Sequence, residues 1–365
     1  MNPSLPDKKV VLVTGATGNV GKEVLMQLAK MTDRYEIRAF DLKTKRSLAF
    51  FDKLKDRIKR RILPKYGDIT KVQTLEEATR GVDVTLHFAS LIPPAAYRNP
   101  ALTEAINVGG TRNLIDALER NAPNSFLLFS SSVAVYGDRI TNPEIRAGDP
   151  LRPSVGDNYA ETKVKMEQLI RESNLDSTIF RLSAIMGAGN HHVSGIMFLM
   201  PLATPMEFTT PRDTARAFVN ALEHLDELKG KTFNLGGGEQ CRVDYDEFLQ
   251  SNFEIAGLGK LDFPEGAFAE HNYHCGIFVD GDELEQIVHF RRDTLQSLYE
   301  MTRKATPCWK RFGAWLLAPI IKRALLKQSD PYKAYRKGTD SERARYFFPD
   351  TVARLKASET AQKHS

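Results

Sequence analysis

Cysteines are few in this sequence and long apolar runs are absent, and both facts limit what the chain can be. The three cysteines, at positions 241, 275 and 308, lack the paired spacing of a zinc site or a disulfide framework. Unpaired thiols favour a reducing compartment, so we expect a cytoplasmic protein. No stretch reaches about 18 continuous apolar residues, which argues against a conventional membrane span. The first residues, MNPSLPDKK, lack the apolar segment of a secretory signal.

A strong excess of charge is absent as well. The formal net charge of +5 over 365 residues is modest, and near the motifs described below aromatic residues are not interleaved with basic ones, so we expect no nucleic-acid partner. The adjacent His191 and His192 have no paired Cys, His or carboxylate nearby at ligand spacing. We therefore expect no metal site.

A glycine-rich turn near the start is the most informative feature that is present. Residues Val10–Val13 form a β-branched apolar run typical of a buried parallel strand. The run leads into Thr14-Gly-Ala-Thr-Gly-Asn-Val-Gly21, after which Val24, Leu25 and Leu28 recur with helical spacing. Glycines let the backbone approach a pyrophosphate, and the free N–H groups of the helix start hold its charge. The segment predicts a dinucleotide site, with a plain strand–helix turn as the alternative.

A second motif is Tyr159-Ala-Glu-Thr-Lys163, whose two outer residues share one face of a helix. An ammonium beside a phenol favours the phenolate, so we expect Lys163 to lower the pKa of Tyr159 from about 10. A tyrosine tuned in this way can act as an acid or base near neutral pH. The spacing alone is typical of a solvated helix face. It gains weight from the preceding run Phe129-Ser-Ser-Ser-Val-Ala-Val-Tyr-Gly137.

Strand-like and helical patterns alternate through the first half of the chain. We expect strands at 10–13, 36–40, 61–66, 82–88, 125–130 and 177–182, and helices near 21–31, 74–80, 101–121 and 159–173. Such alternation predicts an α/β fold, in which a doubly wound parallel sheet carries helices on both faces. Ligands of these sheets bind beyond the carboxyl ends of the strands, where the motifs above lie.

In their order along the chain, these motifs resemble those of the extended short-chain dehydrogenases/reductases, the NAD-dependent epimerase/dehydratase family. The resemblance covers about residues 8–300. Further matching segments are Asp41, Gly67-Asp68-Ile69, His87–Ser90, Asn107–Thr111, Phe180–Ser183, Thr210–Leu222 and Phe233–Gly237. The resemblance implies a Rossmann-type fold with a smaller C-terminal substrate lobe. It also implies an NAD(P)-dependent oxidoreductase or epimerase that acts on a small-molecule substrate.

The resemblance further implies the cofactor-binding residues. Those expected at the pyrophosphate and its turn are Gly15, Thr17, Gly18, Asn19, Val20 and Gly21. Those expected along the rest of the cofactor are Asp68, Ile69, Phe88, Ala89, Ser90, Asn107, Ser130, Tyr159 and Lys163. Asp41 would bind the adenosine ribose hydroxyls, which favours NAD. The basic residues that follow it, Lys43, Lys45 and Arg46, could instead bind the 2′-phosphate of NADP.

The implied catalytic residues are Ser132, Tyr159 and Lys163. Hydride transfer at a secondary alcohol or ketone requires a proton to move at the oxygen, while the cofactor carries the redox chemistry. Tyr159 would move that proton, and Lys163 would bind the nicotinamide ribose. Ser132 would hydrogen-bond the reacting oxygen, with Ser131 as the alternative if the register shifts by one. Asn107 would order a proton relay, or would be a solvated helix residue.

Departures from the family pattern bear on the substrate, whose pocket we expect to include Ile92, Pro93, Ser132, Ala184 and Met186. Ala184 stands where nucleotide-sugar enzymes usually carry asparagine, and the segment 187–210 is short and apolar. The Met and Phe residues of this segment would either line an apolar pocket or belong to the hydrophobic core. Val133 and Ala134 replace the acidic pair of dehydratases. A dehydrogenase, a nucleotide-sugar epimerase and a redox-silent dinucleotide-binding module all remain open.

We expect three parts in the chain. A Rossmann domain would span 8–184, its sheet completed by parts of 205–236, and a substrate lobe would comprise 185–205 and 237–300. In the helix expected at 211–222, Asp213 is interpreted as a structural cap rather than a catalytic acid. By resemblance, helices 101–121 and 159–173 would form a homodimer interface.

A basic and aromatic helical extension would follow at 301–365. Its segment 309–327 contains both tryptophans of the chain and several lysines and arginines. Pro319 would kink this helix. We expect the helix either to dock on the catalytic body or a dimer partner, or to lie at a membrane surface, which would make the protein membrane-peripheral.

Overall fold

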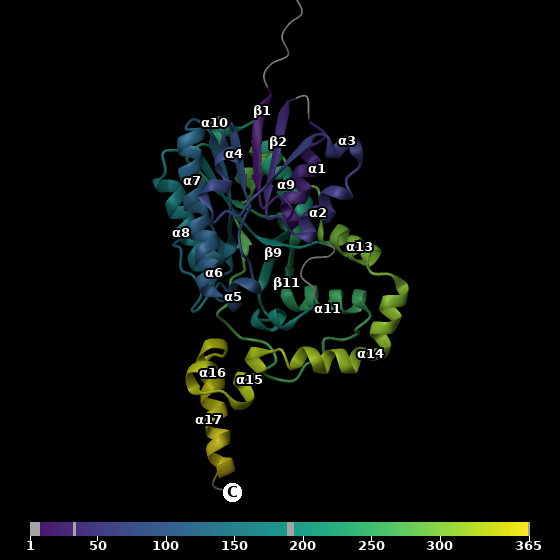
Figure 1. The fold of residues 1–365 in the computed structure, drawn as a ribbon. Helices are drawn as coiled ribbons and strands as arrows, with labels where there is room; N and C mark the ends of the chain where they lie inside the picture. The colour runs from purple at the N-terminus through teal and green to yellow at the C-terminus, as the bar shows by residue number, and fades with distance from the viewer. Residues whose placement is uncertain (1–7, 32–33, 188–192, 364–365) are drawn as a thin grey trace, which may run out of the picture.

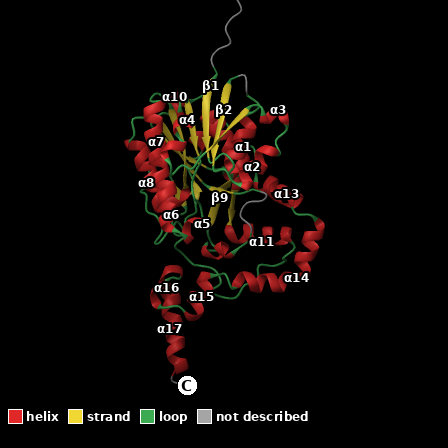
Figure 2. Cartoon of the chain, viewed as in Figure 1, coloured by secondary structure: helices red, strands yellow, loops and turns green. Residues whose placement is uncertain are grey.

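A seven-stranded parallel sheet forms the centre of the computed structural model, which describes residues 8–31, 34–187 and 193–363 (Figures 1 and 2). The strand order is β10-β7-β5-β4-β1-β2-β3. The strands are β1 (Lys9–Thr14), β2 (Tyr35–Asp41), β3 (Ile62–Tyr66), β4 (Val84–His87), β5 (Phe126–Ser132), β7 (Asp176–Leu182) and β10 (Thr232–Leu235). The predicted doubly wound fold is confirmed. The strand order reverses between β1 and β4, and this switch point is where such sheets bind ligands.

Helices cover both faces of the sheet. The helices of this part are α1 (Asn19–Leu28), α2 (Lys45–Asp52), α3 (Asp56–Lys59), α4 (Glu76–Thr79), α5 (Ala95–Arg98), α6 (Pro100–Glu104), α7 (Gly110–Asn121), α8 (Asn158–Glu172), α9 (Pro211–Ala221) and α10 (Leu225–Leu228). Val11 and Val13 of β1 lie in the core under α1 and α9, while Leu12 between them lies in the core under α7 and α8. This alternation explains why the strand is apolar throughout.

A smaller lobe lies beyond the carboxyl ends of the strands. Its three-stranded sheet has the order β11-β9-β8. Its elements are β8 (Ala184–Ile185), β9 (Pro205–Thr209), β11 (Arg242–Asp244) and α11 (Tyr245–Ala256), with β6 (Glu144–Ile145) paired to β12 (Ile277–Phe278). The next helix, α12 (Asp282–Val288), returns to the main sheet and packs on α9 and β10. Met197, Phe198 and Met200 are buried in the core of this lobe. The idea that these three side chains line an apolar pocket is therefore wrong, because they pack against one another and α11.

The tail of the chain is helical and extends along and away from the lobe (Figure 1). It consists of α13 (Leu295–Ala305), α14 (Cys308–Leu326), α15 (Asp330–Lys337), α16 (Asp340–Tyr346) and α17 (Pro349–Lys363). One side of α14 packs on the lobe core. The helix is continuous in its residues and contains Pro319, and it changes direction about half-way along its length, in agreement with the predicted kink (Figures 1 and 2). Within the ranges described above, no helix is long and apolar enough to cross a membrane.

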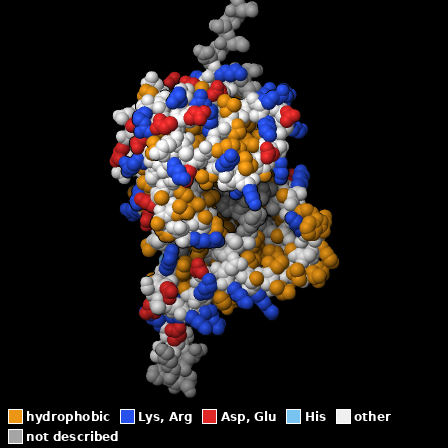
Figure 3. All heavy atoms as spheres, viewed as in Figure 1, with side chains coloured by type: hydrophobic (Ala, Val, Ile, Leu, Met, Phe, Trp, Pro, Cys, Tyr) orange, Lys and Arg blue, Asp and Glu red, His pale blue; other side chains and the backbone are white. Residues whose placement is uncertain are grey.

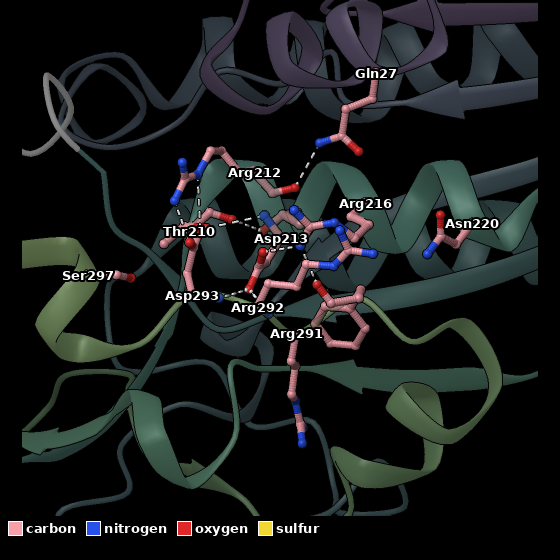
Figure 4. A network of polar contacts seen from close by, with 12 residues as sticks. Gln27, Thr210, Arg212, Asp213, Arg216, Asn220, Arg291, Arg292, Asp293 and Ser297 are labelled. Carbon is pink, nitrogen blue, oxygen red and sulfur yellow. Dashed lines mark hydrogen bonds and ion pairs between the residues drawn. The ribbon is translucent and has the colours of Figure 1, made fainter. Parts of the chain in front are cut away.

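A polar network joins α9 to the segment that follows α12 (Figure 4). The residue that caps α9 is Thr210, whose hydroxyl accepts the N–H of Asp213 at 3.2 Å. Asp213 is therefore structural, as expected, but it is not the cap. Its buried carboxylate accepts the backbone N–H groups of Arg292 and Asp293, both at 2.8 Å, and pairs with Arg216. One carboxylate thereby fixes the returning chain against the helix.

We expect Asp213→Asn to lower the free energy of unfolding by about 1–3 kcal/mol, because an amide has one acceptor oxygen and no charge. Urea unfolding followed by circular dichroism measures this change. Asp226→Asn, at an exposed first-turn position of α10, is the matched control and should change the free energy by much less. Equal effects of the two substitutions would contradict the anchoring role.

Candidate active site

The glycine turn between β1 and α1 is closely packed against the end of β4. Gly15 has a φ of +65°, and a Cβ there would lie 2.8 Å from the backbone nitrogen of Ala89. A Cβ on Gly21 would lie 2.4 Å from the carbonyl oxygen of Gly15. Gly18 precedes α1 and offers no side-chain cap to its first N–H groups. The turn thus brings bare backbone to a helix start, as a pyrophosphate cradle requires.

Asp41, at the end of β2, lies against this turn. Its carboxylate accepts the N–H and hydroxyl of Thr17, at 2.7 and 2.8 Å, and the N–H of Leu42 at 2.8 Å. Asp41 therefore fixes the turn whatever else it binds. Burial and then the charge of Arg46 lower the pKa of Lys22, while Asp41 raises it. Lys22 therefore lies near Asp41 and Arg46, although the sequence analysis did not include it among the cofactor-binding residues. Its position in the first turn of α1, directly after the glycine turn, could have indicated this role.

The loops after β3 and β4 complete the edge of the sheet. Asp68 accepts the N–H and hydroxyl of Thr70, at 3.0 and 2.8 Å, and these bonds lower its pKa. Ile69 is buried beneath α7, and the ring of Phe88 lies 4.5 Å from that of Phe218. The hydroxyl of Ser90 is buried and has no hydrogen-bond partner among the described residues. An orphaned donor beside the glycine turn is a group that a bound polar ligand would satisfy.

The three serines that end β5 point in different directions. Ser130 donates to the carbonyl of His87 at 2.9 Å, and Ser131 donates to Glu167 at 2.6 Å. The Ser132 side chain hydrogen-bonds with Tyr159. Strand alternation thus commits the Ser131 hydroxyl to the structure and leaves Ser132 beside the tyrosine.

Tyr159 and Lys163 lie one turn apart on α8 and are both buried. The Lys163 ammonium lies 5.8 Å from the centre of the Tyr159 ring and donates to the Ser130 carbonyl at 2.8 Å. Burial raises the pKa of Tyr159, although the hydrogen bond with Ser132 opposes the change. Burial lowers the pKa of Lys163 to about 7, against the charge of Glu167. The expectation of a lowered tyrosine pKa is therefore wrong for the protein by itself, because desolvation of the phenol outweighs the hydrogen bond with Ser132.

The buried lysine predicts a pH-dependent stability. The pKa of Lys163 falls from 10.5 to about 7 on folding, so between these values the unfolded chain binds a proton that the folded chain does not. The contribution of Lys163 to stability therefore rises as the pH increases from about 7 towards 10. We expect Lys163→Met to flatten this rise in urea unfolding experiments. Lys165→Met, at an exposed position of the same helix, should leave it unchanged, and parallel curves for all three proteins would refute the assignment.

Asn107 lies in a π-helical turn, Ala105–Gly109, between α6 and α7. Its amide accepts the N–H of Leu91 at 2.7 Å and donates to the Leu91 carbonyl at 3.1 Å and to the Thr162 hydroxyl at 3.0 Å. The alternative of a solvated residue is wrong, since Asn107 is fully buried. It ties the loop that carries the predicted pocket residues Ile92 and Pro93 to the helix of Tyr159.

A second group at the start of α8 was not found from the sequence. Asp157 caps this helix through the N–H of Ala160 at 3.0 Å, and its other oxygen lies 2.8 Å from Nδ1 of His274. The hydroxyl of Tyr97 approaches the same oxygen at 3.5 Å. An Asp before a helix signals the cap, but nothing in the sequence links it to His274, more than a hundred residues away. The lobe thereby touches the start of the helix that carries Tyr159.

The remaining pocket candidates differ in how far they are exposed. Ile92 is 54% exposed, whereas Ala184 and Met186 are half-buried at the entry to the lobe. His191 and His192 lie outside the described residues. No group of three or more potential ligands for a metal occurs among the residues that the structure describes.

Comparison with known proteins agrees with this geometry. Residues 12–188 match the model of the 3-beta hydroxysteroid dehydrogenase/isomerase family. The matched segment makes up just under half of the chain. The match contains the glycine turn, the serine run and the Tyr159–Lys163 pair, and ends at the entry to the lobe.

Two of the individual relatives are named for their action on hydroxysteroids. The 3 beta-hydroxysteroid dehydrogenase type 7 of Mus musculus is 29% identical over 169 residues, 45% of this chain and 44% of the relative. The 3 beta-hydroxysteroid dehydrogenase/Delta 5-->4-isomerase of Mycobacterium tuberculosis is 30% identical over 232 residues, 59% of this chain and 58% of the relative. The chain thus spans about half the length of the curated relatives that it matches.

A solved structure extends the likeness of the fold. The UDP-glucuronic acid 4-epimerase of Bacillus cereus, in complex with UDP-glucuronic acid and NAD, is 18% identical. It covers 81% of this chain and 98% of its own, with a TM-score of 0.66. The sheet and the lobe together therefore share the fold of this epimerase.

Proposed function

We propose that this protein is an NAD(P)-dependent dehydrogenase or reductase that acts on a secondary alcohol or ketone of a largely apolar substrate. The observation that carries the proposal is the cluster of Ser132, Tyr159 and Lys163 beside the glycine turn. These residues supply a hydroxyl donor, a proton-transferring phenol and a cation, which are the groups that the reaction needs besides a hydride carrier.

The residues at the turn fit a dinucleotide. Gly15 and Gly21 leave no space for a Cβ, and the orphaned Ser90 hydroxyl lies after the neighbouring strand. A bound nicotinamide ring would accept or donate the hydride. Asp41 supports NAD as the cofactor, whereas Lys22 and Arg46, which share its corner, support NADP as the alternative.

Proton transfer falls to Tyr159 in this proposal. Because its pKa is raised, the phenol holds its proton at neutral pH and can donate it to a substrate carbonyl oxygen during reduction. Ser132 would hold that oxygen. A protonated Lys163 would stabilise the phenolate that remains, and the reverse steps would serve oxidation. Asn107 and Asp157 position the helix and loop around these groups.

An apolar substrate is supported by what the site lacks. Ala184 offers no amide to a sugar diphosphate. In the lobe, Arg242 is held by Glu207 at 3.0 Å and by the Phe278 carbonyl at 3.0 Å. The names of the hydroxysteroid relatives point the same way, so a 3β-hydroxysteroid is the first substrate to assay. A nucleotide-sugar epimerase is the second candidate, favoured by the likeness over sheet and lobe to the UDP-glucuronic acid epimerase.

The state of the cofactor separates these candidates. The protein is purified without added nucleotide and denatured, and any released dinucleotide is identified by mass spectrometry. An empty site that binds added NADH or NADPH supports the dehydrogenase, which exchanges its cofactor every turnover. Stoichiometric NAD supports the epimerase, which regenerates it in place. Binding without turnover of any alcohol or sugar supports the redox-silent module and would overturn the proposed chemistry.

We also propose a homodimer in the cytoplasm, formed through α6, α7 and α8. Leu102 of α6 is 45% exposed, and such a side chain is available to a partner helix. Sedimentation velocity of the wild type and of Leu102→Glu tests this proposal, since a charge there would favour the monomer.

A further inference from the structure

An exposed apolar strip runs along α14, outside the proposed active site. Trp309, Phe312, Leu316 and Ile320 are spaced by three, four and four residues and so share one face of the helix. Their exposed fractions are 71%, 65%, 65% and 65%. Six of the fourteen large apolar side chains that are exposed among the described residues lie on this helix. Such concentration on one element marks an interaction surface.

The strip is not needed to hold α14 in place. The opposite side of the helix packs on the lobe core through Ala314, Ala318, Ile321, Leu325 and Leu326. In Figure 3 apolar side chains accordingly gather on the outer edge of the lobe, where α14 runs. The helix is therefore a fixed support that presents the strip to the surroundings.

The charged residues of α14 itself are all basic, although Asp262 pairs with Lys322 and Glu254 lies near Arg311. Between Cys308 and Lys327 the chain has five basic residues, Lys310, Arg311, Lys322, Arg323 and Lys327, and no Asp or Glu. Arg323 and Lys327 are exposed and continue the line of the strip beyond Ile320. A second copy laid antiparallel on the strip would set basic ends against basic ends. An anionic surface would instead meet complementary charge along the whole helix.

We propose that α14 lies in the interface of an anionic phospholipid bilayer, with Phe312, Leu316 and Ile320 of the strip buried among the upper acyl chains. Trp309 and Trp315 would lie at the headgroup level, which suits indole rings because one end is apolar and the other donates a hydrogen bond. Arg323 and Lys327 would contact lipid phosphates. Measured along its bent axis the helix is about 28 Å long, and its exposed apolar residues would hold the catalytic body beside the membrane.

The two tryptophans make the proposal directly measurable. They are the only tryptophans of the chain, and both lie exposed on α14. Full-length protein is mixed with vesicles of phosphatidylcholine alone or of phosphatidylcholine and phosphatidylglycerol in equal amounts. We expect a blue shift of tryptophan emission and co-sedimentation with the anionic vesicles, both weakened by high salt.

Variants separate the two contributions. Arg323→Gln with Lys327→Gln should lower the partition coefficient into anionic vesicles about 30-fold. Leu316→Ser with Ile320→Ser should lower it by at least about tenfold while keeping both reporter tryptophans. The matched control is Leu63→Ser, an apolar side chain on edge strand β3 that is 45% exposed, and it should leave binding unchanged.

Two results would overturn the proposal. One is an emission maximum that anionic vesicles do not move. The other is a dimer in solution that Leu316→Ser with Ile320→Ser converts to monomer without reducing vesicle binding, because the occupant of the strip would then be a second copy. Neither result depends on hydride transfer, so this test of membrane binding is independent of the test of the proposed function.

Discussion

Tyr159→Phe is expected to reduce the turnover of an active alcohol or ketone about 10²–10⁴-fold, the range that a positioned acid or base contributes. Phenylalanine preserves the buried ring but removes the hydroxyl that is hydrogen-bonded with Ser132. Because the ring remains, the binding of NADH or NADPH should change little. Turnover is measured by cofactor absorbance, and binding by the fluorescence of the reduced cofactor.

Tyr35→Phe is the matched control for this experiment. Tyr35, at the start of β2, is also buried, and its hydroxyl donates to Glu223, which follows α9. This substitution should leave turnover within about twofold, as expected for a hydroxyl outside the site. If Tyr159→Phe retained full turnover, proton transfer would have to occur elsewhere and the proposed mechanism would be wrong.

Arg181→Met is expected to lower the free energy of unfolding by about 3–5 kcal/mol, the largest effect on stability that we anticipate. Arg181 and Glu167 form a buried two-bond ion pair at 2.9 and 2.7 Å, with side chains 4% and 2% exposed. Removing the guanidinium leaves the Glu167 carboxylate buried, with the Ser131 hydroxyl and the more distant Arg171 as its remaining direct partners among the described residues. Urea unfolding measures the change.

A double substitution tests whether the unpaired charge is the cause. Arg181→Met with Glu167→Met removes both charges together and should cost less than the sum of the two single changes. Arg171→Met is the control, because this arginine is 47% exposed and contacts Glu167 only at 3.4 Å. If the free-energy changes of the two single substitutions simply added up in the double variant, the loss of stability would arise from packing rather than from the buried charge.

Local patterns in the sequence predicted the elements of the sheet closely. The six expected strands all occur, each with ends within about two residues of those predicted, because a β-branched run between turns has few other stable conformations. The helix expected at 101–121 is instead interrupted by a π-helical turn at 105–109. No periodicity indicates that interruption, which turns Asn107 inward to bond with Leu91 and Thr162.

The site itself was only partly accessible from sequence. The Tyr159–Lys163 spacing follows from helix geometry, but the direction of the tyrosine pKa does not. That direction depends on desolvation, which is set by how many groups far along the chain cover the phenol. For the same reason the sequence did not indicate His274 or Lys22 as part of the site, and it did not indicate that the Ser90 hydroxyl has no partner. The role of each residue depends on neighbours that only folding provides.

By itself, the sequence determined the doubly wound α/β fold, the glycine turn and the residues expected to transfer a proton, since each depends on contacts within a few residues. Tertiary structure alone decided that Ser132 rather than Ser131 faces Tyr159, that Met197, Phe198 and Met200 are core, and that α14 is docked on one side and bare on the other. These outcomes depend on which segments far apart in the sequence pack against each other. That packing sets the burial and the electrostatic environment of each side chain, which a local sequence pattern does not determine.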